Sequence, residues 1–258
     1  MGRIIVTQNN KGGVGKTSAT VNLAHSLALR GKSVLVADLD NQCNATSLLL
    51  GDIGRCSMYD VLTEPDKPIQ DCIYNTHYTG VDAIPNIEIT SALEPILVGE
   101  LPDSYKIFRS RIRDYATTTY DYTIVDTPPN MGYFVVSALY AADLVLVPIV
   151  AGSTFSLEGL RKAVNLIDQI SNDGNPDLQF LRLLVNQVDR RTTLSKTTKD
   201  HITKQFGSDV AFETTIPSSA DFQRAESEGK SIIRYKAASA GAKAYRSLAE
   251  ELDRILEA

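Results

Sequence analysis

A glycine-rich loop near the N-terminus constrains the possible folds of this chain more than any other feature. An apolar run at residues 4–6 precedes the loop, and a helical pattern over residues 16–30 follows it. Residues 10–17 match the phosphate-binding template of Gly, four residues and Gly-Lys-Ser/Thr, except that Asn10 occupies the first position. A strand, a glycine loop and a helix in this order predict an α/β fold with a phosphate site. The alternative is a simple glycine turn between strand and helix.

The chemistry of the loop assigns a task to each residue type. Glycines adopt positive φ, and they let backbone N–H groups surround an anion at the positive end of the following helix. Lys16 is expected to reach the β- and γ-phosphates, and the Thr17 hydroxyl is expected to bind Mg²⁺. The predicted nucleotide site in this loop consists of Lys11, Gly12, Gly13, Val14, Gly15, Lys16, Thr17 and Ser18.

Composition is that of an ordinary globular protein. Of the 258 residues, 43% are hydrophobic and 22% are charged. No apolar run reaches the roughly 18 residues of a transmembrane helix, and the N-terminus lacks a signal-peptide layout, so we expect a cytoplasmic protein. Cys43, Cys56 and Cys72 lack the spacing of a metal site. We expect them to be reduced thiols and not part of a disulfide framework.

Continuous apolar runs alternate with helical patterns along the chain. The runs at residues 33–37, 122–125, 144–150 and 181–185 are typical of strands that are buried on both faces. Right-handed crossovers then give an α/β fold with one doubly wound, mostly parallel sheet and helices on both faces, in a single domain over residues 1–258. Short strands are also expected at 81–85 and 210–216, and helices at 45–50, 58–62, 104–116, 133–142, 156–170, 192–206 and 237–256.

Acidic residues follow two of the predicted buried strands. Asp38 and Asp40 come directly after the run at 33–37, and Asp126 follows the run at 122–125. Carboxylates in such places are costly unless they have partners or a task, and ligands of open α/β sheets bind at these carboxyl ends. Asp126 matches a Walker B element, whose carboxylate helps to hold Mg²⁺. An ordinary turn at the strand end is the alternative.

Together these motifs resemble those of the ParA/MinD ATPases, which carry a deviant Walker A box, and in particular the short ParA-type partition ATPases. The resemblance covers nearly the whole chain and is weakest between about residues 50 and 115. Asn41 stands where the family usually has proline. The matching segments are residues 11–17, 38–42, 126–129, 156–160, 216–217, 225–229 and 235.

The resemblance implies an ATPase that hydrolyses ATP slowly until a partner stimulates it. Two protomers are expected to close around ATP as a homodimer. Lys11 of each protomer would then reach the phosphates of its partner's nucleotide, while Lys16 would bind its own. Asp40 is expected to position the attacking water. Lysines, Mg²⁺ and one carboxylate suffice for phosphoryl transfer, because that reaction needs positioning and charge neutralisation.

The resemblance also assigns the remaining contacts to ATP or ADP and its Mg²⁺. Thr17 is expected to bind the metal directly and Asp126 through water. Asn186 and the backbone around Pro217 are expected to contact adenine.

The charge distribution predicts a polyanion-binding face in the C-terminal third. The net charge is −5, yet residues 182–246 carry twelve Lys and Arg against seven Asp and Glu. The main hypothesis is therefore a nucleoid-associated ATPase whose ATP-bound dimer binds double-stranded DNA without sequence preference. A ParB-like or other cargo adaptor would stimulate hydrolysis and release, and so segregate a plasmid or chromosome or position a protein cargo. A solvated surface with chance asymmetry is the alternative. The candidate DNA-binding residues are Arg190, Arg191, Lys196, Lys199, Lys204, Arg224, Lys230, Arg234 and Lys236.

Two other functions belong to relatives of the same scaffold. A MinD-like regulator of cell division cycles on and off the membrane, which requires an amphipathic C-terminal helix with basic flanks. Residues 248–258 have an acidic polar face, so we expect no membrane contact and interpret their leucines as core residues. A metabolic enzyme or a metal-cluster protein is the third possibility, but the three cysteines lack cluster spacing.

Overall fold

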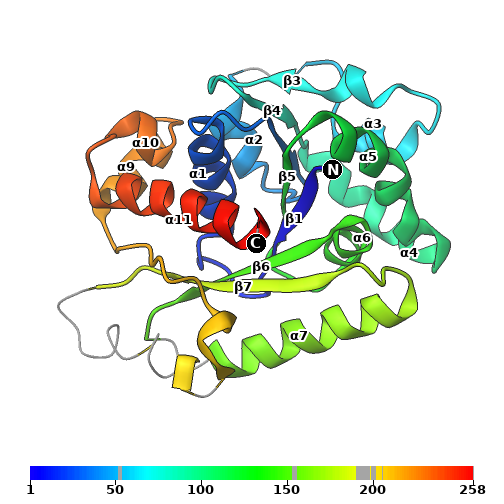
Figure 1. Cartoon of the computed structure of the whole chain (residues 1–258). Coiled ribbons are helices and arrows are strands. Elements are labelled where there is room, and N and C mark those ends of the chain that lie inside the picture. The colour runs from blue at the N-terminus through cyan, green and yellow to red at the C-terminus, as the bar shows by residue number, and fades with distance from the viewer. Residues whose placement is uncertain (52–53, 153–155, 190–197, 199–201, 205, 258) are drawn as a thin grey trace.

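A seven-stranded sheet in the order β3-β4-β2-β5-β1-β6-β7 forms the centre of the molecule (Figure 1). The computed structural model describes residues 1–51, 54–152, 156–189, 198, 202–204 and 206–257, with the backbone alone at 156–161. All neighbouring strands are parallel except β3 and β4, which are antiparallel. The strands are β1 (Arg3–Thr7), β2 (Val34–Asp38), β3 (Tyr74–Asn75), β4 (Val81–Ile84), β5 (Tyr122–Asp126), β6 (Leu144–Val150) and β7 (Gln179–Asn186).

Helices cover both faces of this sheet (Figure 1). The α-helices are α1 (Lys16–Ala28), α2 (Asn44–Leu49), α3 (Met58–Thr63), α4 (Glu94–Gly99), α5 (Lys106–Thr119), α6 (Tyr133–Ala141), α7 (Ser156–Asp173), α9 (Ala220–Ser227), α10 (Ile232–Tyr235) and α11 (Ala240–Glu257). Short 3₁₀ helices occur at η1 (Ile69–Cys72), η2 (Glu88–Leu93), η3 (Asp103–Tyr105) and η4 (Ser208–Val210).

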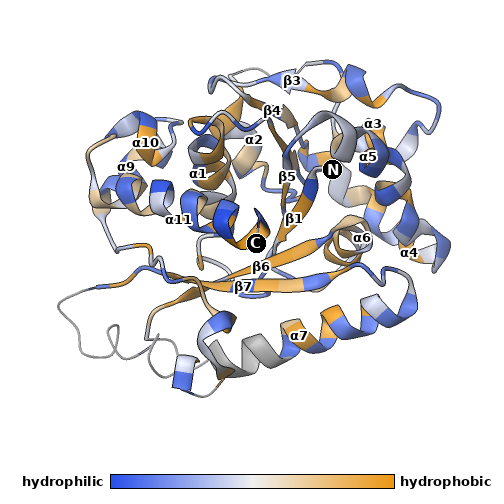
Figure 2. Cartoon of the chain, viewed as in Figure 1, coloured by the Kyte–Doolittle hydropathy of each residue, from blue (hydrophilic) through white to orange (hydrophobic). Residues whose placement is uncertain are grey.

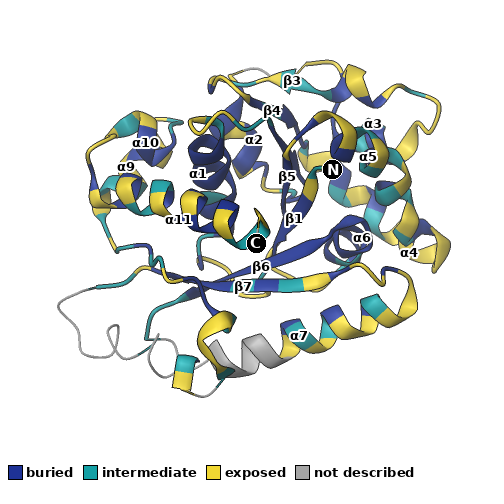
Figure 3. Ribbon diagram, viewed as in Figure 1, coloured by how far each residue is buried: buried dark blue, intermediate teal, exposed yellow. Residues whose placement is uncertain are grey.

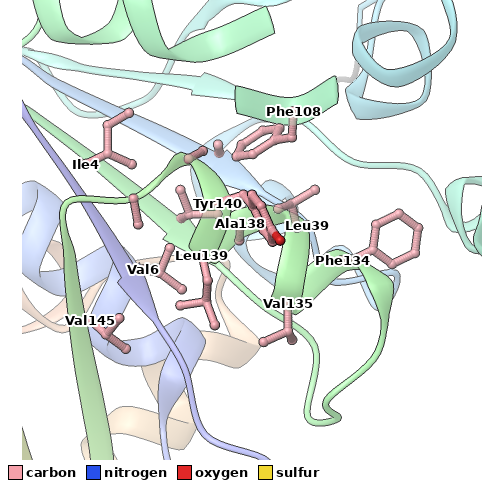
Figure 4. Packing of buried hydrophobic residues seen from close by; sticks show 14 of the residues in the cluster. Ile4, Val6, Leu39, Phe108, Phe134, Val135, Ala138, Leu139, Tyr140 and Val145 are labelled. Atoms are coloured by element: carbon pink, nitrogen blue, oxygen red, sulfur yellow. The ribbon is translucent and has the colours of Figure 1, made fainter. Parts of the chain in front are cut away.

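Each face of the sheet carries its own apolar core, and β1 contributes to both. Ile4 and Val6 belong to the cluster under α5 and α6, whereas Ile5 belongs to the cluster under α1 and α11. Successive side chains of a strand point to opposite faces, so a strand covered on both faces is apolar throughout. The central strands are accordingly hydrophobic in Figure 2 and buried in Figure 3. In Figure 4, Phe108 and Leu139 are among the side chains gathered in the first cluster.

The doubly wound sheet and most of the expected elements are confirmed, but the strand expected at residues 210–216 is wrong. Among the described residues, this segment forms only isolated bridges, Leu183–Ala211 and Val188–Pro217. The N–H groups of Phe212 and Ile216 donate to the carbonyls of Leu183 and Val185 in β7, but those of Glu213 and Thr214 donate to the Glu251 carboxylate, at 2.6 and 2.9 Å, and this interrupts the pairing. The helix expected at 192–206 lies mostly outside the described residues.

The expectation of three reduced thiols is also wrong. Cys56 and Cys72 are joined in a disulfide, with their Cα atoms 4.7 Å apart, while Cys43 is a buried free thiol. The pairing arises because α3 packs against η1 and because the Tyr74 hydroxyl accepts the Cys56 N–H at 3.0 Å. Contacts of this kind cannot be read from cysteine spacing.

The C-terminal helix α11 packs against α1 with its apolar side, as expected for its leucines. Leu248 and Leu252 are fully buried. The buried Asp253 accepts hydrogen bonds from Arg30 and from the Tyr122 hydroxyl, both at 2.8 Å. Within the described part of the chain, no helix has the length and apolarity needed to span a bilayer.

Candidate nucleotide site

The glycine loop connects β1 to α1 and needs glycine at two positions. Gly13 and Gly15 have φ angles of +73° and +90°, in the left-handed region that side chains with a Cβ rarely adopt. Gly15 directly precedes Lys16, the first residue of α1. A Cβ on Gly15 would also lie 2.7 Å from Nδ2 of Asn186, so a side chain there would push aside the Asn186 side chain at the end of β7.

The two lysines of the loop lie in different environments. Lys16 is buried, and burial lowers its pKa even though Asp126 and Asp40 act in the opposite direction. Lys11 is exposed on the loop surface. Its backbone N–H donates to Asn9 Oδ1 at 3.0 Å, and Asn9 in turn donates to the carbonyl of Pro148 in β6 at 2.7 Å. The loop thus presents Lys16 to its own cavity and Lys11 to the outside.

A fully buried carboxylate, Asp126, lies beneath the loop at the end of β5. Its oxygens accept hydrogen bonds from the hydroxyls of Thr17, at 2.7 Å, and Thr20, at 3.2 Å. Burial raises the pKa of Asp126, and the nearby Asp38 carboxylate raises it further. A hydroxyl and a carboxylate side by side are the hard oxygen donors that Mg²⁺ prefers, so these residues fit the predicted metal site.

Asp38 and Asp40 share the loop after β2 but have different partners. Asp38 accepts from the backbone N–H and the hydroxyl of Thr46, at 2.9 and 2.7 Å, and from the Asp40 N–H at 3.0 Å. Burial raises the pKa of Asp38. Asp40 Oδ1 accepts the Gln42 N–H at 3.0 Å, and Asp40 borders the cavity beside the glycine loop. Asp38 therefore fixes the loop, and Asp40 faces the cavity.

Two neighbouring cavities share Gly13, Gly15, Ser18 and Glu226 along their boundary. The first, of about 400 Å³, brings together the predicted Lys16, Thr17 and Asp40. Its lining is Gly12, Gly13, Gly15, Lys16, Thr17, Ser18, Asp40, Gln42, Asn44, Ser47, Leu48, Pro129, Glu226 and Gly229. The second, of about 550 Å³, is lined by Gly13, Gly15, Ser18, Asn186, Gln187, Ile216, Pro217, Ser218, Ser219, Ala220, Phe222, Gln223, Glu226 and Tyr245.

Asn186 has an unused acceptor at the second cavity. Asn186 is buried, and its Nδ2 donates to the Val14 carbonyl at 2.9 Å. Its Oδ1 is also buried and has no hydrogen-bond partner within the described structure. A buried polar atom without a partner costs free energy, so a donor supplied by a ligand would stabilise this position.

Several residues of the site escaped sequence reasoning. Gln187, with a φ of +57°, donates from Nε2 to the Gly13 carbonyl at 2.8 Å. The fully buried Tyr245 hydroxyl interacts with Ser18, and burial raises its pKa. The sequence signal that could have identified Gln187 is its position next to Asn186. Tyr245 lies in the last helix, far from any motif, and no sequence signal pointed to it.

The predicted DNA-binding residues fall into three groups. Arg190, Arg191, Lys196 and Lys199 lie outside the described residues. Lys204 precedes η4, which packs against β7. The others lie in or beside α9 and α10, and several of them have acidic neighbours. Those pairs are Lys236–Asp221 at 3.0 Å, Arg224–Asp221 at 3.7 Å and Lys230–Glu228 at 2.8 Å, while Arg234 is exposed beside them.

Comparisons with known proteins found a family model, curated relatives and solved structures that are similar to this chain. A family model described as an AAA domain matches residues 2–180. The chain is 36% identical to the sporulation initiation inhibitor protein Soj of Bacillus subtilis, covering 98% of each chain. It is 34% identical to the chromosome partitioning protein ParA of Caulobacter vibrioides, covering 97% of this chain and 93% of ParA. A crystal structure of cobyrinic acid a,c-diamide synthase from Mycobacterium smegmatis with bound ADP and magnesium superposes with a TM-score of 0.83 at 25% identity, covering 100% of this chain and 96% of that one.

Removing the charge of Asp126 should stabilise the protein without nucleotide. The pKa of Asp126 is raised above 3.8 in the folded state, so the folded protein holds a proton that the unfolded chain releases. Stability from this group therefore falls as the pH rises above about 4. We expect the free energy of unfolding of Asp126→Asn to exceed that of wild type by about 1–3 kcal/mol near pH 8. This difference should shrink toward pH 4. Urea unfolding at several pH values measures this.

The exposed Asp114→Asn variant is the matched control and should show no such pH-dependent gain. A variant Asp126→Asn that is less stable than wild type at every pH would contradict the raised pKa.

Proposed function

Because this chain belongs to the family of Soj and ParA partition ATPases, we propose that it positions a cargo on DNA through ATP-dependent dimerisation. It is an ATPase that uses Mg²⁺ with its nucleotide. The observation that carries the proposal is the meeting of Lys16, Thr17 and Asp40 at one cavity above Asp126. This set of residues can neutralise and orient a transferring phosphoryl group.

Adenine is the base that the second cavity favours. Asn186 Oδ1 is a buried acceptor without a partner, and the exocyclic amino group of adenine is a donor. The carbonyl oxygen of guanine at the corresponding position would be repelled there. Pro217 borders the same cavity and offers backbone groups to the base.

The phosphate end of the site combines a cation, a hydroxyl and two carboxylates. Mg²⁺ supplies charge neutralisation between the phosphates, and Thr17 and Asp126 are the residues that would hold it. Lys16, which is buried and close to Asp126 and Asp40, would bind the β- and γ-phosphates. Asp40 would orient the attacking water from the cavity wall. Water exclusion strengthens each of these interactions.

Dimerisation follows from the second lysine. Lys11 is exposed while Lys16 is buried, so we assign Lys16 to the protomer's own nucleotide and Lys11 to that of a facing protomer. We propose that ATP closes two protomers in this way, and that a ParB-like or other cargo adaptor triggers hydrolysis and reopening. The location that fits this cycle is the cytoplasm, on the nucleoid.

DNA binding would use the basic residues of the C-terminal third. Within α9 and α10, Asp221 and Glu228 partly neutralise their basic neighbours, which leaves Arg234 as the strongest single candidate there. A dimer doubles the number of phosphate contacts, so a modest patch on one protomer can suffice.

The alternative functions have less support. Cobyrinic acid a,c-diamide synthase shares the fold at 25% identity, whereas the identity to Soj is 36% over 98% of both chains. The MinD-like alternative requires a helix that inserts its leucines into lipid, but Leu248 and Leu252 of α11 are buried in the core. These leucines are therefore not available to a membrane in this structure.

ATP with Mg²⁺ should make the protein retard duplex DNA of any sequence in a gel, and ADP should not. Because phosphate contacts dominate, raising the salt from about 50 to 200 mM should weaken binding by roughly tenfold or more. Binding that needs no ATP, or that needs lipid, would exclude the proposed cycle.

Removing the charge of Asp40 should stop turnover and leave the ATP-bound dimer intact. Asp40→Asn keeps an oxygen for the Gln42 N–H, so the loop should hold its shape. We expect ATP hydrolysis to fall by about 100-fold or more, measured as phosphate release, with dimerisation measured by light scattering. The exposed Asp66→Asn is the matched control. Hydrolysis at the wild-type rate in Asp40→Asn would remove Asp40 from the reaction.

The two lysines should separate binding from dimerisation. Lys11→Ala should bind a fluorescent ATP analogue with similar affinity but remain monomeric in light scattering, because its proposed contact lies on the partner's nucleotide. Lys16→Ala should bind the analogue with about 100-fold lower affinity, because a charged contact to phosphate is removed. An ATP-dependent dimer that persists in Lys11→Ala would refute the contact between protomers.

A further inference from the structure

The loop that carries Asp40 is held through a backbone carbonyl that accepts two hydrogen bonds. The carbonyl oxygen of Asp40 accepts the backbone N–H of Cys43 at 2.9 Å and Nδ2 of Asn86 at 3.0 Å. The first bond closes a β-turn whose central residues are Asn41 and Gln42. The second bond comes from a residue that follows β4. The Asp40 carbonyl is therefore held both from inside its own turn and from the neighbouring strand.

Asn86 continues the contact between β2 and β4 beyond the point where their pairing ends. The two strands pair in parallel up to Ala37 and Ile84. Pro85 comes next, and it has no backbone N–H with which to extend the ladder. The Asn86 side chain supplies an N–H group and directs it at the Asp40 carbonyl. One side-chain hydrogen bond thus joins the end of β4 to the loop with Asp40.

The Asn86 side chain is fully buried and has a fixed orientation. Its Oδ1 accepts the backbone N–H of Ile87 at 2.9 Å, so its nitrogen is the atom that faces Asp40. The backbone N–H of Asn86 donates to Thr46 Oγ1 at 2.9 Å, and the Thr46 hydroxyl donates to Asp38 at 2.7 Å. Rotation of the amide would leave buried polar atoms unpaired, which costs free energy. Asn86 therefore offers the Asp40 carbonyl a rigid support.

The turn itself could be stiffened from within at position 41, but this chain has asparagine there. Position 41 is the second residue of the turn, where proline is favoured because its fixed φ suits that conformation. The N–H of Asn41 donates to no group in the described part of the chain, so a proline would cost no hydrogen bond there. The bond from Asn86 supplies from outside a restraint that proline would supply from within.

We propose that Asn86 is a positioning residue for ATP hydrolysis, which holds the turn so that the Asp40 carboxylate meets the attacking water. Asn86 is not among the described residues that line the two cavities, so it acts through Asp40. The inference rests on the proposed function, because Asp40 is the residue assigned there to the water. A displacement of about 1 Å at a reacting group can slow a reaction by roughly 100-fold, so a support outside the cavity can matter for turnover.

Steady-state hydrolysis by Asn86→Ala tests this role. We expect kcat to fall by about tenfold or more, because the carboxylate is no longer held in place. The KM for ATP and the affinity for a fluorescent ATP analogue should change by less than about twofold, because the glycine loop is untouched. A kcat within about twofold of wild type would overturn the proposal.

Asn175→Ala is the matched control for the loss of a buried amide. Asn175 is also fully buried, and its Nδ2 donates to the carbonyls of Leu139 and Ala142, at 2.8 and 2.7 Å, away from the site. This variant should lose stability and keep the kcat of wild type. An equal fall of kcat in Asn175→Ala would show that any buried asparagine has the same effect, and the proposal would fail.

A second substitution, Asn41→Pro, should rescue Asn86→Ala. The proline restrains the turn from within, so the double variant should recover at least about half of the wild-type kcat. A merely structural role of Asn86 would not be repaired in this way, because the buried amide is still missing. A double variant no faster than Asn86→Ala would refute the positioning role.

Hydrogen exchange without nucleotide provides a second measurement. Amide protons of residues 40–43 should exchange faster in Asn86→Ala and return toward the wild-type rate in the double variant, and unchanged exchange in Asn86→Ala would contradict the proposal. If Asn86→Ala does not fold, Asn86→Ser takes its place with the same expected results, since a serine hydroxyl is one bond too short to reach the Asp40 carbonyl.

The Asp40→Asn variant separates the two possible failures. If Asp40→Asn hydrolyses ATP at the wild-type rate, the proposed role of Asp40 itself is wrong. If Asp40→Asn is inactive while Asn86→Ala turns over normally, the role of Asp40 stands and only the role of Asn86 is refuted.

Discussion

Three adjacent parallel strands end at the same level of the sheet, and the candidate site depends on that register. Asp126 at the end of β5 is paired with Thr7 of β1 on one side and with Asp38 of β2 on the other. Each strand is followed by a loop of the candidate site. The glycine loop follows β1, the loop with Asp40 follows β2, and the loop with Pro129 follows β5. A register slip of one residue would send each side chain to the opposite face. The apolar cores on both faces prevent such a slip, so the packing of the sheet determines the placement of the polar groups of the candidate site.

This convergence places like charges close together in a dry environment. Burial raises the pKa of both Asp38 and Asp126, and it lowers the pKa of Lys16. The charged form of each of these groups is therefore less stable in the folded protein than it would be in water. Hydrogen bonds from Thr46 and Thr17 offset part of the cost. A bound phosphate would compensate the charge of Lys16, and its metal ion would compensate the carboxylates. The remaining cost of these buried charges would therefore be offset by the ligand.

The sequence was sufficient for the parts of the site that depend on contiguous residues. Residues 10–17 must be consecutive to wrap a phosphate, and Asp126 must follow its strand directly, so both were predictable. The hydrogen bond from Gln187 to Gly13 joins residues far apart in the chain, and so does the disulfide between Cys56 and Cys72. Such contacts arise from the fold as a whole. Residues 210–216 were expected to form a strand, but the Glu251 carboxylate binds the N–H groups of Glu213 and Thr214 and so interrupts the pairing of this segment with β7.

The glycine loop is tied to the rest of the molecule on two sides. Asn9 anchors it to β6, and Asn186 and Gln187 anchor it to the end of β7 through the carbonyls of Val14 and Gly13. A loop held in this way loses little conformational entropy when a nucleotide arrives. Such preorganisation favours the diphosphate almost as much as the triphosphate, because both use the same cradle. We therefore expect discrimination between the two to come from parts of the site outside this cradle, and Pro129 in the loop after Asp126 borders the same cavity as Lys16 and Asp40.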